Sequence, residues 1–230
     1  MNILVTGGAG YIGSITCVQL IAAGFRPVIL DSLVNAKAAV LDRIEQVSGH
    51  RPDFIEADVR DRSRVLQVLR EHAIDAVIHF AGLKAVGESV AQPLRYYDNN
   101  VQGSLVLIDA MREAGVKTLV FSSSATVYAE MQDMPLREDA PLGASNPYGR
   151  SKLMVEQMLE DFDRAYGLKS VCLRYFNAAG ADPEGQLGER HSPETHLIPL
   201  VLQAASGKRS HISVFGRDYD TPDGTCIRDY

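Results

Sequence analysis

Residues 2–13 read NILVTGGAGYIG, an apolar run that passes directly into a group of glycines. The glycines fit two spacings at once, because Gly7, Gly10 and Gly13 are three residues apart and Gly8 lies two residues before Gly10. Glycine has no Cβ, so such a turn can bend tightly and bring backbone N–H groups close to a phosphate. A helix that starts there adds the positive end of its dipole. The stretch therefore predicts a strand, a pyrophosphate-binding turn and a helix in succession.

A second signal lies 18 residues beyond Gly13, where Asp31 ends another apolar run. In βαβ units that bind dinucleotides, an acid at about this spacing hydrogen-bonds the ribose diol. A carboxylate there would repel a 2′-phosphate, so the sequence favours NAD over NADP as the cofactor. The alternative is a helix-start turn with incidental glycines and a capping Asp31, and it does not account for the order of strand, turn, helix, strand and acid.

Short strands and longer helical segments alternate through the first 176 residues. Strands alternating with helices imply right-handed crossovers, a parallel sheet and helices on both of its faces. The predicted fold class is α/β, a doubly wound parallel sheet of the Rossmann type. Its strand candidates are Ile3–Thr6, Arg26–Leu30, Asp53–Glu56, Ala76–Phe80, Thr118–Ser122 and Ser170–Leu173.

Helices are predicted over Tyr11–Ala23, Leu94–Ala114 and Tyr148–Tyr166. In the second and third of these, apolar residues recur at the helical period, which suits a helix packed on a sheet. The stripes are Leu94, Tyr97, Val101, Leu105, Ile108 and Met111 in one helix, and Val155, Met158, Leu159, Phe162 and Tyr166 in the other.

The character of the sequence changes after residue 176. Residues 177–230 are rich in glycine and proline and contain one predicted helix, Leu197–Ser206, and one predicted strand, Ile212–Phe215. That is too little for an independent core, so this part has to pack on something else. We expect a cofactor-binding Rossmann domain over residues 1–176 and, over residues 177–230, the start of an incomplete C-terminal substrate-binding region.

Tyr148 and Lys152 place a phenol and an ammonium four residues apart, on one face of a helix that Pro147 helps to start. A free phenol titrates near pH 10, and its use as a base near neutrality needs a pKa shift of roughly 3 units, or about 4 kcal/mol. A neighbouring Lys⁺ and a cationic nicotinamide could supply that shift together. The alternative is a surface helix on which both side chains simply face solvent.

Residues 120–126 read VFSSSAT, a buried-looking strand that ends in hydroxyl groups. Open α/β sheets bind their ligands at the carboxyl ends of the strands, where a serine can hydrogen-bond a substrate alcohol. Strand-end capping by serine and threonine is the competing interpretation.

Composition excludes several classes of protein. With 46% hydrophobic and 23% charged residues the chain can bury a core, and a net charge of −6 without a basic block gives no footprint for nucleic acid. No apolar run approaches the roughly 18 residues that would span a bilayer. Cys17, Cys172 and Cys226 are far apart and suggest neither disulfides nor a zinc cage, so we expect a cytoplasmic protein with no metal site.

Longer strings of residues identify a family. The chain resembles the extended short-chain dehydrogenase/reductase superfamily, and within it the UDP-glucose 4-epimerases. The resemblance covers the whole chain and rests on TGGAGYIG (6–13), HFAGLKAVGES (79–89), YYDNN (96–100), SSSATVY (122–128), YGRSK (148–152), RYFN (174–177) and DGTCIRDY (223–230).

The resemblance implies transient oxidation of UDP-glucose and UDP-galactose at the sugar C4 by tightly bound NAD. Ser124, Tyr148 and Lys152 would be the catalytic group, with Tyr148 as the base, Ser124 orienting the sugar oxygen, and Lys152 lowering the tyrosine pKa and holding the nicotinamide ribose. Cofactor contacts implied with them are Gly7, Gly10, Tyr11, Ile12, Gly13, Asp31, Asn35, Lys37, Asp58, Val59, Phe80, Ala81, Gly82, Lys84, Asn99 and Phe176. Substrate contacts implied are Ser124, Tyr148, Asn177, His196, Leu197 and Arg228.

The resemblance also implies a homodimer, formed through a four-helix face from the helices over Leu94–Ala114 and Tyr148–Tyr166. Family members continue well beyond residue 230, so the chain is expected to be either a fragment or a naturally truncated protein that binds NAD without efficient turnover, as a sensor would. A sugar-nucleotide 4,6-dehydratase is the enzymatic alternative, but it needs an acid and base pair where Ala125 and Thr126 stand. Two further departures are Ala129 in place of a usual glycine and His196 where several family members have asparagine.

Overall fold

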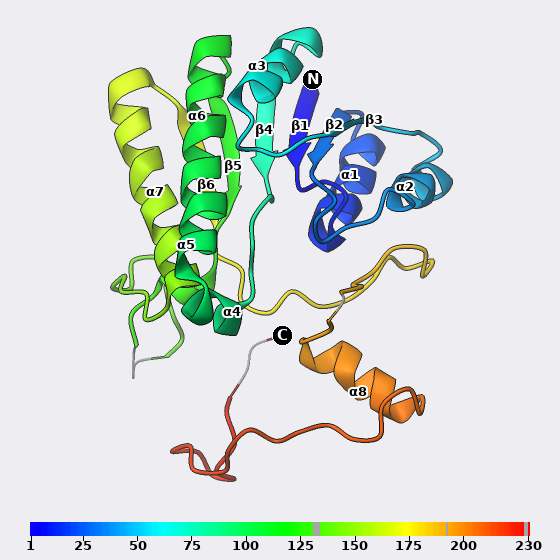
Figure 1. Ribbon diagram of the computed structural model, residues 1–230, viewed down its shortest axis with the longest axis vertical. Helices are drawn as coiled ribbons and strands as arrows, with labels where there is room; N and C mark the ends of the chain where they lie inside the picture. The colour runs from blue at the N-terminus through cyan, green and yellow to red at the C-terminus, as the bar shows by residue number, and fades with distance from the viewer. Residues whose placement is uncertain (131–133, 192, 228–229) are drawn as a thin grey trace.

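Parallel strands form one six-stranded sheet at the centre of the molecule (Figure 1). The computed structural model describes residues 1–130, 134–191, 193–227 and 230, and every element named below lies in those ranges. The strand predictions up to residue 173 are confirmed, with each end within one residue of its expected place. The strands are β1 (Asn2–Thr6), β2 (Arg26–Asp31), β3 (Asp53–Glu56), β4 (Ala76–His79), β5 (Thr118–Ser122) and β6 (Lys169–Leu173).

The order of the strands places a topological switch point between β1 and β4. It runs β3-β2-β1-β4-β5-β6, so the chain proceeds outward from β1 in one direction and from β4 in the other. The loops that follow β1 and β4 therefore diverge, and the carboxyl ends of two such strands are where sheets of this kind bind their ligands. This is the doubly wound arrangement that the sequence predicts.

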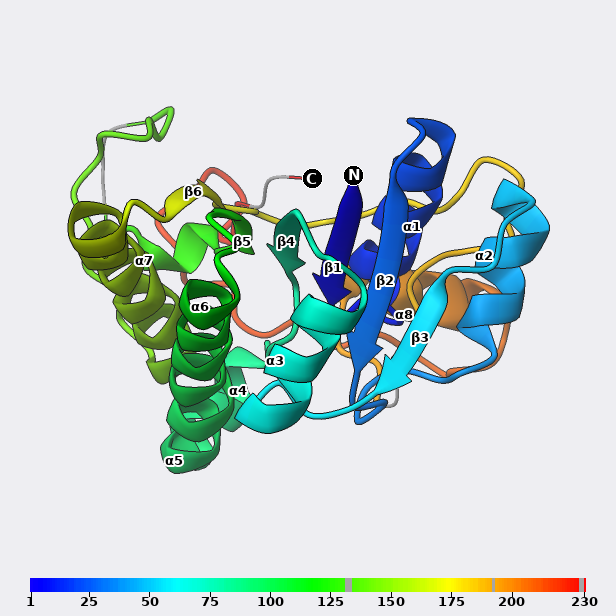
Figure 2. The ribbon, with the colours of Figure 1, turned by 90° about the horizontal axis from the view of Figure 1, so that it is seen from above.

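Helices cover both faces of the sheet, as Figure 2 shows. On one face lie α1 (Tyr11–Ala22) and α2 (Val40–Ser48), and on the other lie α3 (Arg62–Glu71), α6 (Gly103–Ala114) and α7 (Pro147–Tyr166). Short helices α4 (Val86–Ala91) and α5 (Pro93–Tyr96) precede α6. Within the ranges that the structure describes, no helix combines the length and the apolar character needed to cross a membrane.

Two hydrophobic cores lie on the two faces, because successive strand residues point to opposite sides. Leu4 and Leu30 belong to the core beneath α3, α6 and α7. Their neighbours in the chain, Val5 and Ile29, belong to the core beneath α1 and α2. Each of these four side chains is at most 1% exposed.

The apolar stripe predicted over Leu94–Ala114 does not lie on one face. A π-helix, Tyr97–Gln102, joins α5 to α6, and the wider turns rotate everything after it by about 100° relative to a continuous α-helix. Met111 is fully buried, whereas Leu94 is 81% exposed and Leu105, in the same helix as Met111, is 43% exposed. The outer part of the stripe instead lines a groove with Met154 of α7.

The region after β6 has little packing of its own. Its predicted helix is confirmed as α8 (Leu197–Ala205), but α8 has no buried residue. The strand predicted over Ile212–Phe215 is wrong, because residues 211–216 pair with no strand in the described part of the chain and Phe215 is 88% exposed. Leu187 is the buried hydrophobic side chain that this region contributes, and it joins the core beneath α1 and α2.

Candidate active site

The glycine turn after β1 is held by close backbone contacts. Gly7 adopts a φ of +70°, and its N–H donates to the Leu30 carbonyl at 2.9 Å. A Cβ on Gly7 would lie 2.6 Å from the Ala81 nitrogen, and a Cβ on Gly13 would lie 2.3 Å from the Gly7 oxygen. A Cβ on Gly10 would meet only the Gly7 oxygen among the described atoms, at 3.2 Å. Packing thus requires glycine at positions 7 and 13, whereas Gly10, directly before α1, is less crowded.

Tyr11 and Ile12 form the first turn of α1, directly after Gly10. The Tyr11 hydroxyl donates to the carbonyl of Gly180 at 2.7 Å, so the start of α1 holds the segment that follows β6. Burial raises the pKa of Tyr11, and the nearby Glu189 carboxylate raises it further.

Asp31 ends β2 beside the turn, as the sequence predicts. One carboxylate oxygen accepts from Ala9 N at 3.0 Å and the other accepts from Leu33 N at 2.8 Å. Burial raises the pKa of Asp31, and these two N–H donors oppose that rise. The carboxylate therefore fastens the glycine turn to β2, and its remaining lone pairs are what a ribose diol would meet. Asn35 and Lys37 are exposed on the loop that follows.

Asp58 and Val59 follow β3 at the same edge of the sheet. Asp58 pairs with Arg60 at 2.6 Å, and that guanidinium lowers the pKa of Asp58. Arg60 also pairs with Asp98 in the π-helix. Val59 is 5% exposed and packs against Gly103 of α6. A Cβ on Gly103 would lie 2.8 Å from Val59 Cγ1. The adenine side of the predicted site is therefore tied to α6.

The loop over residues 80–84 follows β4 and is fixed by a residue that sequence reasoning missed. Asn100, 3% exposed in the π-helix, accepts from Leu83 N at 2.8 Å and donates to Leu83 O at 2.9 Å. Its predicted neighbour Asn99 donates to the Asn100 side chain at 3.0 Å. The sequence did contain a signal for Asn100, namely a polar residue inside an apolar helical segment. The face of the helix on which Asn100 lies, however, depends on the π-helix.

Ser124, Tyr148 and Lys152 come together at the carboxyl end of β5. The phenol of Tyr148 and the hydroxyl of Ser124 are hydrogen-bonded to each other. Tyr148 stands in the first turn of α7, which starts where the Asn146 side chain accepts from Gly149 N at 2.9 Å. Ser124 is 7% exposed and Lys152 is 5% exposed. The helix start thus aims the tyrosine at the serine.

The Lys152 ammonium is buried between these groups. It donates to the Ser122 carbonyl at 2.8 Å and lies 5.9 Å from the centre of the Tyr148 ring. The ammonium also lies 4.9 Å from the centre of the Phe121 ring. A Cβ on Gly82 would lie 3.4 Å from the ammonium, so the loop after β4 adjoins it. The lysine therefore connects the predicted cofactor side and the tyrosine side of the site.

The electrostatics differ from the expectation for Tyr148. Burial raises the pKa of the phenol, and its hydrogen bond to Ser124 opposes that rise. Burial also lowers the pKa of Lys152 to about 8, so that the lysine remains mostly charged at pH 7. The expectation that Lys152 makes the phenol acidic is thus not met by these side chains alone, because desolvation of both groups is the larger effect. A further positive charge beside the phenol would be needed.

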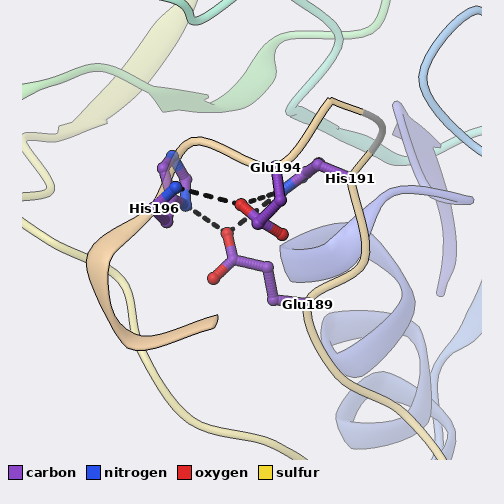
Figure 3. A group of neighbouring side chains, drawn as sticks. All are labelled: Glu189, His191, Glu194 and His196. Carbon is purple, nitrogen blue, oxygen red and sulfur yellow. Dashed lines mark hydrogen bonds and ion pairs between the residues drawn. The ribbon is translucent and has the colours of Figure 1, made fainter. Parts of the chain in front are cut away.

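Another group of titratable side chains lies on the segment before α8 (Figure 3). Potential metal ligands of Glu189, His191, Glu194 and His196 lie within 4.8 Å of one another. Lys84, a predicted cofactor residue, approaches the same group, with its Nζ 2.8 Å from His191 Nε2 and 3.9 Å from Glu189 Oε1. The donor types would suit zinc, but the lysine already supplies a cation to the carboxylates. Burial lowers the pKa of Lys84, and both carboxylates oppose that decrease.

The residues predicted to contact substrate are less closely grouped. Phe176 and Asn177 follow β6 and line a cavity of about 300 Å³. His196 precedes α8 and contacts Glu189, and Leu197 begins α8 and is 50% exposed. Arg228 lies outside the described residues.

Taken together, the site can hold a dinucleotide and move a proton. The glycine turn and the N-terminus of α1 suit a pyrophosphate, while Asp31 suits a ribose. A hydroxyl, a phenol and an ammonium stand together at the same sheet edge, which suits proton transfer at an alcohol.

Comparisons with known proteins agree with this geometry. The family model described as "NAD dependent epimerase/dehydratase family" matches residues 3–230. The chain is 54% identical to a UDP-glucose 4-epimerase of Yersinia pestis, over all of this chain and 69% of that protein. It is 55% identical to a UDP-glucose 4-epimerase of Bacillus subtilis (strain 168), over all of this chain and 68% of that protein.

Solved structures give the same result. A UDP-glucose 4-epimerase from Stenotrophomonas maltophila with bound NAD and formylated UDP-arabinopyranose is 51% identical, with a TM-score of 0.96 over all of this chain and 69% of that one. A UDP-glucose 4-epimerase from Bifidobacterium longum in complex with NAD⁺ and UDP is 46% identical, with a TM-score of 0.97 over all of this chain and 70% of that one.

Proposed function

The chain belongs to the NAD-dependent epimerase/dehydratase family, and from that premise we propose that it interconverts UDP-glucose and UDP-galactose. The observation that carries the proposal is the hydrogen bond between Ser124 and Tyr148 with Lys152 beside them, at the sheet edge that also bears the glycine turn. These groups suit an alcohol that has to lose a proton as it is oxidised.

NAD fits the residues present. The glycine turn offers N–H groups and the N-terminus of α1 to a pyrophosphate, and Asp31 disfavours a 2′-phosphate. The chemistry that NAD supplies when bound is reversible acceptance of hydride from C4 of the sugar. We assign to its binding the remaining positions predicted from the sequence, among them Asn35, Lys37, Asp58 and Val59.

Within this proposal each catalytic side chain has a defined task. Tyr148 removes the proton of the sugar 4-hydroxyl, and Ser124 holds that oxygen through its own hydroxyl. Inversion at C4 requires that the proton return after the sugar has presented its other face, so Tyr148 acts first as a base and then as an acid. Lys152 keeps a positive charge next to the phenol, which favours the phenolate.

The dehydratase alternative is less well supported. Elimination of water needs an acid and a base next to the serine, and Ala125 and Thr126 occupy those positions. Thr126 is also engaged locally, since its hydroxyl donates to Ser124 Oγ at 2.9 Å. The relatives named above are epimerases.

We also propose the division of labour between the two parts of the chain. Residues 1–176 bind the cofactor, and residues 177–230 contribute to the sugar-nucleotide side through Asn177, His196, Leu197 and Arg228. The three cysteines are free thiols in the structure, and a reducing compartment such as the cytoplasm suits them.

A second copy of the chain is the partner that we propose for the outer groove between α5, the π-helix and α7. This groove is lined by Leu94, Tyr97, Asp98, Val101, Gln102, Leu105 and Met154. Helices of two copies packed there would bury the exposed apolar side chains. Sedimentation of Leu94→Asp beside the parent chain tests this, and a monomeric parent would contradict it.

Conversion of UDP-galactose to UDP-glucose by the purified, NAD-loaded chain tests the main proposal. We expect Tyr148→Phe to reduce the rate about 10²- to 10⁴-fold, because it removes the proton acceptor. Tyr166→Phe is the matched control, since Tyr166 lies at the far end of α7 and is 52% exposed. A folded, NAD-loaded parent that converts nothing would instead favour the non-catalytic NAD-binding alternative.

A further inference from the structure

An ion pair with a buried carboxylate lies next to the strand end that carries Ser124. Glu156 of α7 is 6% exposed, and its two carboxylate oxygens accept from Arg174 Nε at 3.1 Å and Nη2 at 2.7 Å. Ser123 donates its hydroxyl to the same carboxylate. Arg174 follows β6, so the pair joins the C-terminal ends of β5 and β6 to the middle of α7.

Arg174 makes further contacts on its other side. Its Nη1 donates to the Tyr128 hydroxyl at 3.1 Å and to the Glu138 carbonyl at 3.0 Å, and its guanidinium lies 4.9 Å from the centre of the Tyr128 ring. All three polar branches of the guanidinium are therefore engaged, which leaves the side chain little freedom.

The pair is connected to the catalytic serine on both of its sides in the chain. Ser123, which donates to Glu156, immediately precedes Ser124. Ala125, which immediately follows Ser124, donates its N–H to the carbonyl of Tyr175 at 2.8 Å. The residues on both sides of Ser124 are therefore held by hydrogen bonds. Ser123 is linked through Glu156 to Arg174, and Ala125 is bonded directly to Tyr175.

The pair is also aligned with the other catalytic residues. Glu156 stands four residues after Lys152 and eight after Tyr148, so the three lie on one face of α7. A shift of the carboxylate would consequently move the strand end that carries Ser124 relative to the helix that carries Tyr148.

We propose that the Glu156–Arg174 pair and Ser123 are positioning residues that set the distance between Ser124 and the Tyr148 phenol. This inference rests on the proposed function, because it concerns the geometry of the same proton transfer. In this role the pair acts through Ser123 and the residues next to Ser124. A buried charge pair contributes little net stability, but removing one partner alone leaves an uncompensated charge, so it holds its partners to one arrangement.

Ser123→Ala is the sharpest test, because it deletes one hydrogen bond to Glu156 and leaves the ion pair intact. We expect kcat to fall roughly tenfold with KM for the UDP-sugar and NAD content unchanged, since small misplacement of reacting groups reduces the rate steeply. We further expect the rising limb of the rate profile, which follows ionisation of the Tyr148 phenol, to move to higher pH, because a weaker bond from Ser124 favours the phenolate less.

Glu156→Gln and Glu156→Asp extend the test. Glu156→Gln should reduce kcat about 10²-fold, and Glu156→Asp, which keeps the charge, should recover part of that loss. Glu113→Gln is the matched control, because Glu113 also pairs with arginines but lies on the surface of α6. Urea unfolding of each variant reports separately on folding.

Titration of the Tyr148 phenol by NMR, with isotope-labelled tyrosine, provides a readout that does not depend on turnover. A higher phenol pKa in Ser123→Ala than in the parent supports the inference even if the parent proves inactive, and inactivity by itself would count against the proposed function. If kcat, the pH profile and the phenol pKa of folded Ser123→Ala all match those of the parent, the positioning role is refuted.

Discussion

Residues 1–176 and residues 177–230 differ in how they are held. The first part buries alternate strand residues in two cores, one under each helical layer. In the described portion of the second part, α8 buries none of its residues, and Leu202, Phe215 and Ile227 are 63%, 88% and 82% exposed. The apolar residues of the second part therefore gain little from the hydrophobic effect in this chain.

The second part is held to the first by hydrogen bonds and one buried side chain. Tyr11 of α1 donates to Gly180, Arg43 of α2 donates to Gln186 at 3.2 Å, and Leu187 enters the core beneath these helices. The comparison teaches that folding and the geometry of the predicted cofactor residues depend on the first part, whereas the placement of the predicted substrate residues depends on a few contacts between the parts.

The largest difference in stability should appear when the same type of substitution, Leu→Ala, is made separately in each part. Leu107→Ala, at a fully buried position of α6, should reduce the free energy of unfolding by about 2–5 kcal/mol through lost burial and a cavity. Leu202→Ala, on exposed α8, should change it by no more than about 0.5 kcal/mol. Urea denaturation measures both, and equal losses would refute the contrast drawn above.

A smaller effect is expected from pH within the first part. His79 is 1% exposed, lies within 2.6 Å of Thr6 Oγ1 and 2.9 Å of Ser104 Oγ, and burial lowers its pKa from 6.5 to about 3. Between these pH values the unfolded chain binds a proton at this residue and the folded chain does not, so stability decreases as the pH falls through that window. The loss should reach about 2 kcal/mol between pH 6.5 and pH 5.

Unfolding free energies of the parent and His79→Gln, measured across that range, check this contribution by difference. The variant should lack the additional slope, whereas His211→Gln, the same change in the exposed part, should keep the slope of the parent. A parent and a His79→Gln chain with the same pH dependence would exclude His79 as its source.

The smallest effect on stability is expected at the hydrogen bond between Tyr11 and Gly180, which connects the two parts. Tyr11→Phe removes the hydrogen bond to Gly180, which should cost about 1 kcal/mol locally. Hydrogen exchange over residues 180–188 should quicken accordingly while exchange in β1 and β5 stays the same. Faster exchange in β1 and β5 as well would show that the contact between Tyr11 and Gly180 also stabilises the first part.

Much of the first part was predictable because its signals are local. Periods of two and 3.6 residues, glycines that packing requires and an acid at the end of β2 all act over short stretches of chain. The π-helix was not predictable in this way, and it carries Asn100, which contacts Leu83. The strand expected over Ile212–Phe215 failed because a strand needs a neighbouring edge for its hydrogen bonds.

In the candidate site, too, some features were predictable from the sequence and others were visible only in the structure. The sequence, with the family resemblance, predicted Ser124, Tyr148 and Lys152 as the catalytic group, and the fold brings these three residues together. It did not indicate that Glu156 and Arg174 form an ion pair, or that Lys84 meets Glu189 and Glu194. Nor did it indicate that burial raises rather than lowers the pKa of Tyr148.

The sequence alone determined the alternation of strands and helices, the glycine turn after β1 and the chemistry of its side chains, because these follow from local backbone preference and residue type. Tertiary structure decided which groups face one another, how far water is excluded from them and hence how their protons are held. Desolvation and pairing arise only between segments that are distant in the chain, and for that reason no local pattern can specify them.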